Sequence, residues 1–319
     1  MKIKNIAAIC CMTVLAGCQQ AEEIENPSEK LPMKIEASIG NQTESRYISN
    51  DGTPNNLSFD KGESIGVFVD NNPIIQWTKG TGETWTPETT EYYWPDKINE
   101  HNFYAFYPWK TGSSKGSIPM PSLLEQTGEI SDLSSHDFLI AKTSETYGED
   151  GMVSFTGDDS FKHVSALIAI TVKGNGDLSQ STINKISFEG TNIASATTYS
   201  FENNSISIVE DKKHNKMEAD LDYEMNSANK TFYFIVNAGN NLSGTKFSIE
   251  YSTGDKNYKA TKEGLGSGTL TSGKQYSFNL TVVEGVLTIS GNTIKDWESS
   301  VLDDIIINGV EQQTETPES

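Results

Sequence analysis

The nine residues Leu31-Pro32-Met33-Lys34-Ile35-Glu36-Ala37-Ser38-Ile39 carry the clearest structural signal in the sequence. Because successive side chains of a β-strand point to opposite faces, their alternation of apolar and polar residues predicts a strand with one buried face. Proline is tolerated near the start of an edge strand, so Pro32 favours an edge position. The side chains predicted to be buried are Leu31, Met33, Ile35, Ala37 and Ile39.

Short strand patterns continue along the chain, separated by segments rich in Gly, Pro, Asn and Thr. They cover residues 64–69, 92–94, 102–107 and 138–142, then residues 164–172, 185–189, 197–201, 231–236, 246–251, 275–283 and 286–289. No long stretch has the period of a helix. The fold is therefore predicted to be all-β, with two β-sandwiches over residues 31–150 and 151–297. Their junction is placed at residues 147–151, where Gly148-Glu149-Asp150-Gly151 has the composition of a linker.

Residues 1–17 have the pattern of a bacterial lipoprotein signal peptide. Lys2 and Lys4 precede an apolar run, and Leu15-Ala16-Gly17-Cys18 resembles a lipobox. The apolar run is about a dozen residues long, short of the roughly 20 that span a bilayer, so a transmembrane helix is the weaker alternative. We expect cleavage between Gly17 and Cys18 and lipidation of Cys18.

Residues 18–30 are polar and acidic and cannot bury a core, so they indicate a flexible leash. Acidic residues close behind a lipidated cysteine resemble the signal that sends Bacteroidetes lipoproteins to the outer face of the outer membrane. An ordinary solvated linker is the alternative. The first interpretation predicts an outer-membrane lipoprotein on the cell surface.

The charge balance limits the possible partners. The chain has 24 basic and 44 acidic residues and a net charge of −20, which excludes nucleic acid as a partner. The same charge disfavours anionic membrane surfaces, so membrane attachment is expected only through the lipid. After signal cleavage Cys18 is the one remaining cysteine, which leaves none for a disulfide or a thiolate metal site.

Signals for enzymatic chemistry are weak. The four histidines are scattered, with no pair at metal-ligand spacing, and no Gly-x-Ser-x-Gly motif occurs. The glycine-rich run of residues 264–268 lacks the following helix that a phosphate site requires. Asp158-Asp159 and Asp303-Asp304 lack the pattern of a calcium loop. We therefore expect no catalytic residues, no metal and no cofactor.

Several different short motifs are spread along almost the whole mature length of the chain. They are Gly62-Glu63-Ser64-Ile65-Gly66-Val67-Phe68, Trp94-Pro95, Tyr104-Ala105-Phe106-Tyr107-Pro108, Asp137-Phe138-Leu139-Ile140-Ala141, Phe161-Lys162-His163-Val164-Ser165-Ala166, Leu270-Thr271-Ser272-Gly273-Lys274-Gln275-Tyr276 and Ile294-Lys295-Asp296-Trp297. In this order they resemble the fimbrillin family of Bacteroidetes, whose members are subunits of surface fimbriae. The resemblance implies two tandem transthyretin-like β-sandwich domains, export as a lipoprotein, and assembly with other fimbrial subunits by strand exchange. Phe59, where the family often has Trp, and Glu63, where Asp is commoner, do not threaten this fold.

Arg46 is the only arginine in the chain and follows the alternating strand. In polymerising fimbrillins an arginine-specific protease cuts an equivalent loop, so the resemblance makes the bond between Arg46 and Tyr47 a candidate processing site. A solvated loop arginine is the alternative. Cleavage would release the lipid together with the strand of residues 31–39 and would leave a groove for a strand from another subunit.

The C-terminal extension, residues 298–319, contains a candidate donor strand and then a polar tail. Val301, Ile305 and Ile307 share one strand face with Asp303, which makes the donor mediocre. Stalk, tip and base roles stay open, with like or unlike subunits as partners. A permanently tethered adhesin that binds a glycan or a host or bacterial surface protein is the alternative function. It rests on aromatic residues that in β-sandwiches more often serve packing, namely Trp77, Trp85, Tyr92, Tyr93, Trp94 and Trp109.

Overall fold

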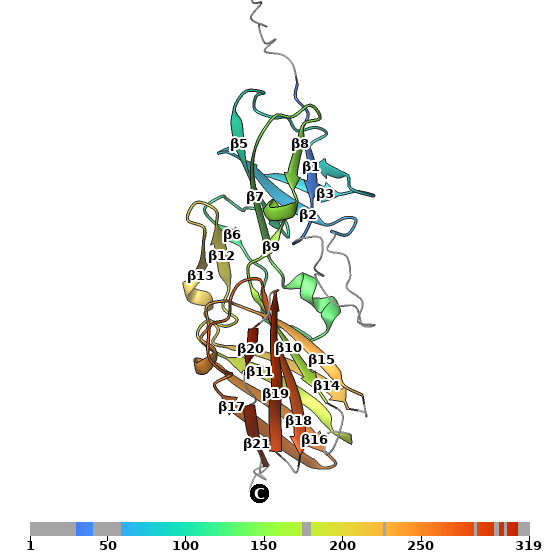
Figure 1. Cartoon of the computed structure of the whole chain (residues 1–319), viewed down its shortest axis with the longest axis vertical. Coiled ribbons are helices and arrows are strands. Elements are labelled where there is room, and N and C mark those ends of the chain that lie inside the picture. Colours follow the sequence, from blue (N-terminus) through green and yellow to red (C-terminus); the bar gives the residue numbers. More distant parts are fainter. Residues whose placement is uncertain are drawn as a thin grey trace, which may run out of the picture.

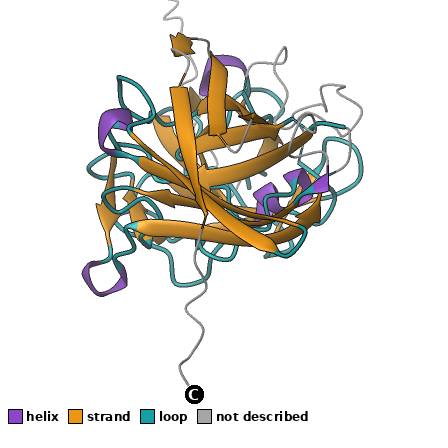
Figure 2. Ribbon diagram, turned by 90° about the horizontal axis from the view of Figure 1, so that it is seen from below, coloured by secondary structure: helices purple, strands orange, loops and turns teal. Residues whose placement is uncertain are grey.

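The computed structural model describes residues 30–40, 59–173, 180–225, 228–283, 286–296, 300–302 and 305–311. Figure 1 shows an elongated molecule with its first strands at one end and its last strands at the other. Strands dominate the described part (Figure 2). Its helical segments are the short 3₁₀ helices η1 (Ile130–Ser135), η2 (Gly157–Asp159), η4 (Glu210–Lys212) and η5 (Leu242–Gly244). The all-β prediction is confirmed.

A six-stranded antiparallel sheet lies at the N-terminal end of the molecule. Its spatial order is β4 (Trp85–Pro87), β3 (Ile75–Lys79), β2 (Ser64–Val69), β5 (Glu100–Tyr107), β7 (Leu139–Thr146) and β9 (Lys162–His163). Val67 and Ala105 belong to one apolar cluster, whereas the adjacent Phe68 and Phe106 belong to another. Because adjacent side chains point to opposite faces, both faces of this sheet are covered.

Two small sheets supply these covers. One consists of β1 (Lys34–Ala37) and β8 (Met152–Phe155), which run parallel and lie side by side in Figure 1. The other has the order β13 (Ser205–Ile208), β12 (Thr197–Ser200) and β6 (Ile118–Pro119). The six-stranded sheet is thus the middle layer between the β1–β8 pair and the β6–β12–β13 sheet.

A ten-stranded sheet forms the C-terminal part of the molecule. Its order is β14 (Lys216–Glu224), β11 (Thr182–Glu189), β16 (Lys246–Thr253), β17 (Lys256–Glu263), β21 (Ile305–Glu311), β19 (Val286–Asp296), β18 (Lys274–Val283), β10 (Ala166–Val172) and β15 (Lys230–Val236), with β20 (Ser300–Leu302) paired to β19. Phe188 on β11 and Phe234 on β15 lie near opposite ends of this order, yet their ring centroids are 5.7 Å apart. The sheet therefore wraps around its own core, as in a sandwich.

A segment from the middle of the chain closes one edge of this sheet. Gln126 is 3% exposed, and its amide nitrogen donates to the carbonyl oxygen of Ile235 at 2.7 Å. The N–H of Ile235 donates back to the Gln126 side-chain oxygen at 2.7 Å. The side chain thus satisfies the outer backbone groups of β15 as a neighbouring strand would. Leu123 and Leu133 from the same segment pack into the C-terminal core.

The observed strands match the sequence pattern unevenly. β2 has the predicted bounds, whereas residues 92–94 form only an isolated bridge, between Pro32 and Tyr93. The pattern did not predict β3, β4, β6, β8, β9, β13, β14 or β17.

The packing also differs from the predicted junction at residues 147–151. β8 follows this point but pairs with β1, and Val153, Phe155 and Phe161 share an apolar cluster with the β1 side chains. The first core therefore continues to Phe161. A run of Gly and acidic residues suits a tight turn as well as a linker, so composition alone does not distinguish the two.

Candidate functional site

The start of the first strand is held by residues that lie far away in the sequence. The N–H of Met33 donates to the carbonyl oxygen of Tyr92 at 2.8 Å, and the N–H of Trp94 donates to that of Leu31 at 2.8 Å. Lys34–Ala37 then pairs in parallel with β8. A single strand thus changes partners along its length.

The end of the strand is fixed in the same manner. The N–H of Ser38 donates to the carbonyl oxygen of Phe155 at 3.0 Å, and the N–H of Phe161 donates to the carbonyl oxygen of Ser38 at 2.9 Å. The N–H of Gly40 then donates to the carbonyl oxygen of Phe161 at 2.9 Å. These partners give residues 31–40 a continuous set of main-chain bonds, such as a separate peptide strand would make.

The side chains of this strand follow the predicted alternation. Lys34 and Glu36 are exposed, whereas Ile35 is 3% and Ile39 1% exposed. Leu31, Met33 and Ala37 are also buried. We call the surface that receives them the β1 seat, defined by the backbone partners above and by the apolar residues Phe59, Ile65, Val67, Trp77, Trp85, Trp94, Phe103, Ala105, Tyr107, Leu139, Ala141, Val153, Phe155 and Phe161.

Aromatic rings form much of the β1 seat. Phe59 makes edge contacts with Trp85, Tyr107 and Phe161 at centroid distances of 5.2, 5.5 and 5.1 Å. The ring of Trp94 meets that of Phe103 at 4.9 Å. Edge-to-face pairs of this kind add to the stability that area burial provides.

The aromatic residues that the sequence indicated as a possible glycan-binding surface serve mainly in packing. Trp77, Trp85 and Trp94 are buried, and Trp109 stacks on Phe106 at 6.3 Å. Tyr92 makes an edge contact with Trp77 at 6.4 Å. The packing interpretation therefore accounts for Trp77, Trp85, Tyr92, Trp94 and Trp109.

Gly151, which lies in the predicted junction, is a part of the β1 seat. Its carbonyl oxygen accepts from the N–H of Lys34 at 3.0 Å and from the indole N–H of Trp94 at 2.9 Å. It has a φ of 68°, and a Cβ there would lie 2.3 Å from the carbonyl oxygen of Pro32. Glycine is therefore required for this close approach of two backbones.

A buried histidine lies against Trp94 at the rim of the β1 seat. His101 Nδ1 is 2.7 Å from Asp70 Oδ2, and the His101 and Trp94 ring centroids are 6.1 Å apart. Burial acts to raise the pKa of Asp70, but hydrogen bonds from the Asn102 backbone and from His101 outweigh it, so the pKa lies below its ordinary value. This hydrogen bond links the β2–β3 turn to β5.

The side chains of His163 and His136 also have local partners. His163 Nδ1 is 2.9 Å from Asp137 Oδ2, and His136 Nδ1 is 2.6 Å from the carbonyl oxygen of Ser122. Within the described ranges, no group of three or more His, Cys, Asp or Glu side chains is arranged to hold a metal ion.

The predicted N-terminal sites fall outside the described residues. These are the cleavage and lipidation residues Gly17 and Cys18 and the processing residues Arg46 and Tyr47. Their roles stay predictions. In the part of the chain that is described, no helix is both long and apolar enough to cross a membrane.

The candidate donor strand is placed in the C-terminal sheet. Val301 lies in β20 and pairs with Thr293, whereas Ile305 and Ile307 lie in β21 and pair with Ile289 and Leu287 of β19. β21 also pairs with β17 through residues 309–311. To enter another subunit, β21 would first have to leave both neighbours.

Three solved structures show the same fold. A candidate cell adhesion protein from Bacteroides ovatus aligns with a TM-score of 0.61 and 16% identity over 87% of this chain and 99% of that one. One from Bacteroides uniformis gives 0.58 and 17% over 86% and 100% of the two chains. One from Bacteroides fragilis gives 0.50 and 12% over 86% and 100%. No curated protein matches the sequence.

The sequence also matches a family model. The model described as fimbrillin-like covers residues 47–297, which is more than half of the chain. The match begins at residue 47, directly after Arg46. β1 therefore lies before the matched region, whereas the apolar residues of the β1 seat lie within it. On this match, the chain belongs to the fimbrillin-like family.

Proposed function

We propose that this chain is a fimbrial subunit that reaches the cell surface as a lipoprotein and joins other subunits by exchanging its first strand. Membership in the fimbrillin-like family supports the fimbrial role. The observation that carries the exchange step is the β1 seat, in which one short segment supplies five buried side chains and a continuous set of backbone bonds.

The energetics favour a replacement strand once β1 is gone. Each of Leu31, Met33, Ile35 and Ile39 contributes roughly 1.5–3 kcal/mol on full burial. Loss of the strand therefore leaves the seat short by an upper bound of about 6–12 kcal/mol, because the reference state is an extended chain. Unpaired main-chain groups of β8 add to this deficit. A strand from another subunit with the same alternation restores both terms.

Cleavage at Arg46 is the proposed trigger. Because Arg46 is the only arginine, an arginine-specific protease has a single possible site in the chain. The cut lies after β1, which ends at Ala37, so it separates β1 from the rest of the molecule. The lipid on Cys18, the acidic leash and β1 would then leave as one fragment.

The proposed occupant is a strand from a like or unlike fimbrial subunit. This chain's own candidate, residues 301–307, includes Asp303 on the same face as Val301, Ile305 and Ile307. The side chains of residues 31–39 that enter the β1 seat are all apolar. An unlike subunit with an uninterrupted apolar face would therefore bind better than a second copy of this chain.

The proposal is tested by mapping N-termini before and after treatment with an arginine-specific protease. The purified mature chain is digested, its fragments are identified by mass spectrometry, and its oligomer size is measured by light scattering with and without co-expressed subunits. The matched control is R46K, which keeps the positive charge but removes the cleavage site.

The expected result is a new N-terminus at Tyr47, loss of the fragment ending at Arg46, and assembly into larger species. R46K should remain uncut and unassembled. A mature chain that is recovered from fimbriae with Cys18 at its N-terminus would contradict the proposal, as would equal assembly of R46K.

A further inference from the structure

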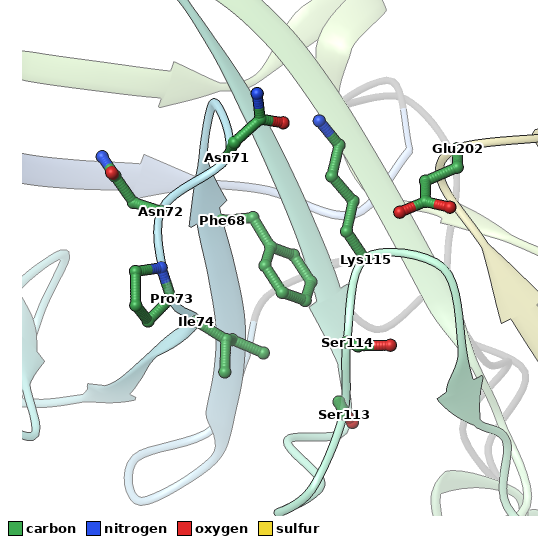
Figure 3. A pocket seen from close by; sticks show the side chains of 9 residues that line it. All are labelled: Phe68, Asn71, Asn72, Pro73, Ile74, Ser113, Ser114, Lys115 and Glu202. Carbon is green, nitrogen blue, oxygen red and sulfur yellow. The ribbon is translucent and has the colours of Figure 1, made fainter.

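A second site lies on the face of the six-stranded sheet opposite the β1 seat. It is a pocket of about 480 Å³ formed by the β2–β3 turn, the turn before β6 and the turn between β12 and β13 (Figure 3). Its volume lies within the roughly 300–1,000 Å³ of small-molecule sites. The lining residues are Phe68, Asn71, Asn72, Pro73, Ile74, Ser113, Ser114, Lys115 and Glu202.

The walls of the pocket are held in place before any ligand binds. Ser114 and Ser117 exchange two backbone hydrogen bonds of 3.0 Å, which makes a tight turn with Lys115 near its tip. The N–H of Phe201 donates to the carbonyl oxygen of Lys115 at 2.9 Å and joins this turn to the Glu202 segment. A fixed pocket loses little conformational freedom when it binds a ligand.

Lys115 also joins this turn to the opposite wall. Its ammonium donates to the carbonyl oxygen of Asp70 at 3.1 Å and lies 4.0 Å from the centroid of the Tyr104 ring. On that wall the N–H of Asn72 donates to the carbonyl oxygen of Val69 at 2.9 Å. The lysine is therefore a fixed part of the pocket.

Several polar groups of the pocket have unused hydrogen-bonding capacity. The side chains of Asn71, Asn72, Ser114 and Glu202 have no hydrogen-bond partner among the residues that the structure describes. Gly116 lies so close to Glu202 that a Cβ would be 2.8 Å from its Oε2, so the carboxylate is packed against backbone at the pocket. In Figure 3, Phe68 lies between the two walls, with Asn71 on one side and Glu202 on the other.

The chemistry of these groups indicates the class of ligand. Amides, hydroxyls and a carboxylate surround an apolar surface from Pro73 and Ile74, with the buried Phe68 beneath it. Such a surface suits the C–H face of a sugar ring, and the polar groups around it suit several hydroxyls. One Lys and one Glu leave the pocket without net charge, and the chain's charge of −20 disfavours an anion.

We infer that this pocket binds the neutral sugar end of a glycan. Asn71, Ser114 and Glu202 hydrogen-bond the hydroxyls, and Pro73 and Ile74 support the ring. This role is independent of strand exchange, because the pocket and the β1 seat lie on opposite faces of the sheet. None of its lining residues was among the aromatic residues that the sequence indicated for glycan binding.

The test uses the full mature chain on an array of neutral glycans and their sialylated counterparts, followed by titration of the best neutral glycan. The variants are E202A and N71A. The matched control is E149Q, which alters an exposed carboxylate in the turn after β7 that does not line the pocket. Circular dichroism melts establish that each variant is folded.

We expect the wild-type chain and E149Q to bind neutral glycans with equal affinity. E202A and N71A should each weaken binding about tenfold, as expected for loss of a hydrogen bond that involves a charged group or an amide. Silence of the neutral array, unchanged affinity of folded E202A and N71A, or preference for the sialylated forms would each overturn the inference.

Discussion

Replacement of Ile35 by alanine should destabilise the uncleaved chain and leave the assembled subunit unaffected. Ile35 is 3% exposed, pairs with Val153 and packs into the aromatic cluster of the β1 seat. Truncation of a buried isoleucine to alanine costs about 2–5 kcal/mol, because transfer energy is lost and a cavity remains. The adjacent Glu36 points to solvent, so E36A is the matched control and should stay within about 0.5 kcal/mol of wild type.

The assay is urea unfolding of the uncleaved chain, followed by tryptophan emission. Three tryptophans of the β1 seat, Trp77, Trp85 and Trp94, report on this region. The transition midpoint of I35A should fall, whereas that of E36A should not. After cleavage at Arg46 and assembly with a partner, the three chains should unfold alike, because residue 35 has left with the released fragment.

Two results would refute this reasoning. Equal midpoints for uncleaved I35A and E36A would mean that β1 contributes no burial energy to the seat. A deficit of I35A that persists in the cleaved, assembled protein would mean that β1 never leaves.

Other consequences of the structure can be measured separately. G151A should destabilise the uncleaved chain by about 1–3 kcal/mol and speed amide exchange in β1. The reason is that residue 151 has a positive φ and that a Cβ there would collide with the carbonyl oxygen of Pro32. Unchanged amide exchange in β1 would contradict this. Q126A should lower the unfolding free energy by about 1–3 kcal/mol for each group of Ile235 left unsatisfied, a loss that a urea midpoint equal to wild type would exclude. The folded-state pKa of Asp70 is lowered, so its contribution is present above about pH 4 and is lost as pH falls through the folded pKa. The stability difference between wild type and D70N should therefore shrink on acidification, and a difference that grows would contradict the assignment.

Local alternation was a sound guide where one face of a strand is buried and the other is wet. Residues 31–39 show this, since their burial follows from side-chain spacing alone, whereas β2 is buried along almost its whole length because both faces of its sheet are covered. β14 has the same alternation, with Met217 and Ala219 buried and Glu218 and Asp220 exposed. Its many charged residues make the segment too polar to be recognised as a strand from its composition. β17 is mostly polar and is ordered by neighbours on both sides, which no local pattern reports.

The partners of the first strand lie beyond the reach of sequence reasoning. The parallel pairing of β1 with β8 joins segments that are far apart in the chain, and nothing in either segment specifies the other. Gly151 shows the same limit. The run of residues 148–151 has the composition of a linker, although the carbonyl oxygen of Gly151 accepts hydrogen bonds from both Lys34 and Trp94. Tertiary contacts decide which interpretation of such a residue holds.

The most direct test of the account is binding of a labelled peptide with the sequence of residues 30–40 to the mature chain before and after cleavage at Arg46. The uncleaved chain should not bind it, because β1 fills the seat, whereas the cleaved chain freed of its fragment should bind one equivalent. A peptide carrying Asp in place of Ile35 should fail to bind. Equal binding by cleaved and uncleaved chains, or by the two peptides, would contradict the claim that β1 occupies an exchangeable seat.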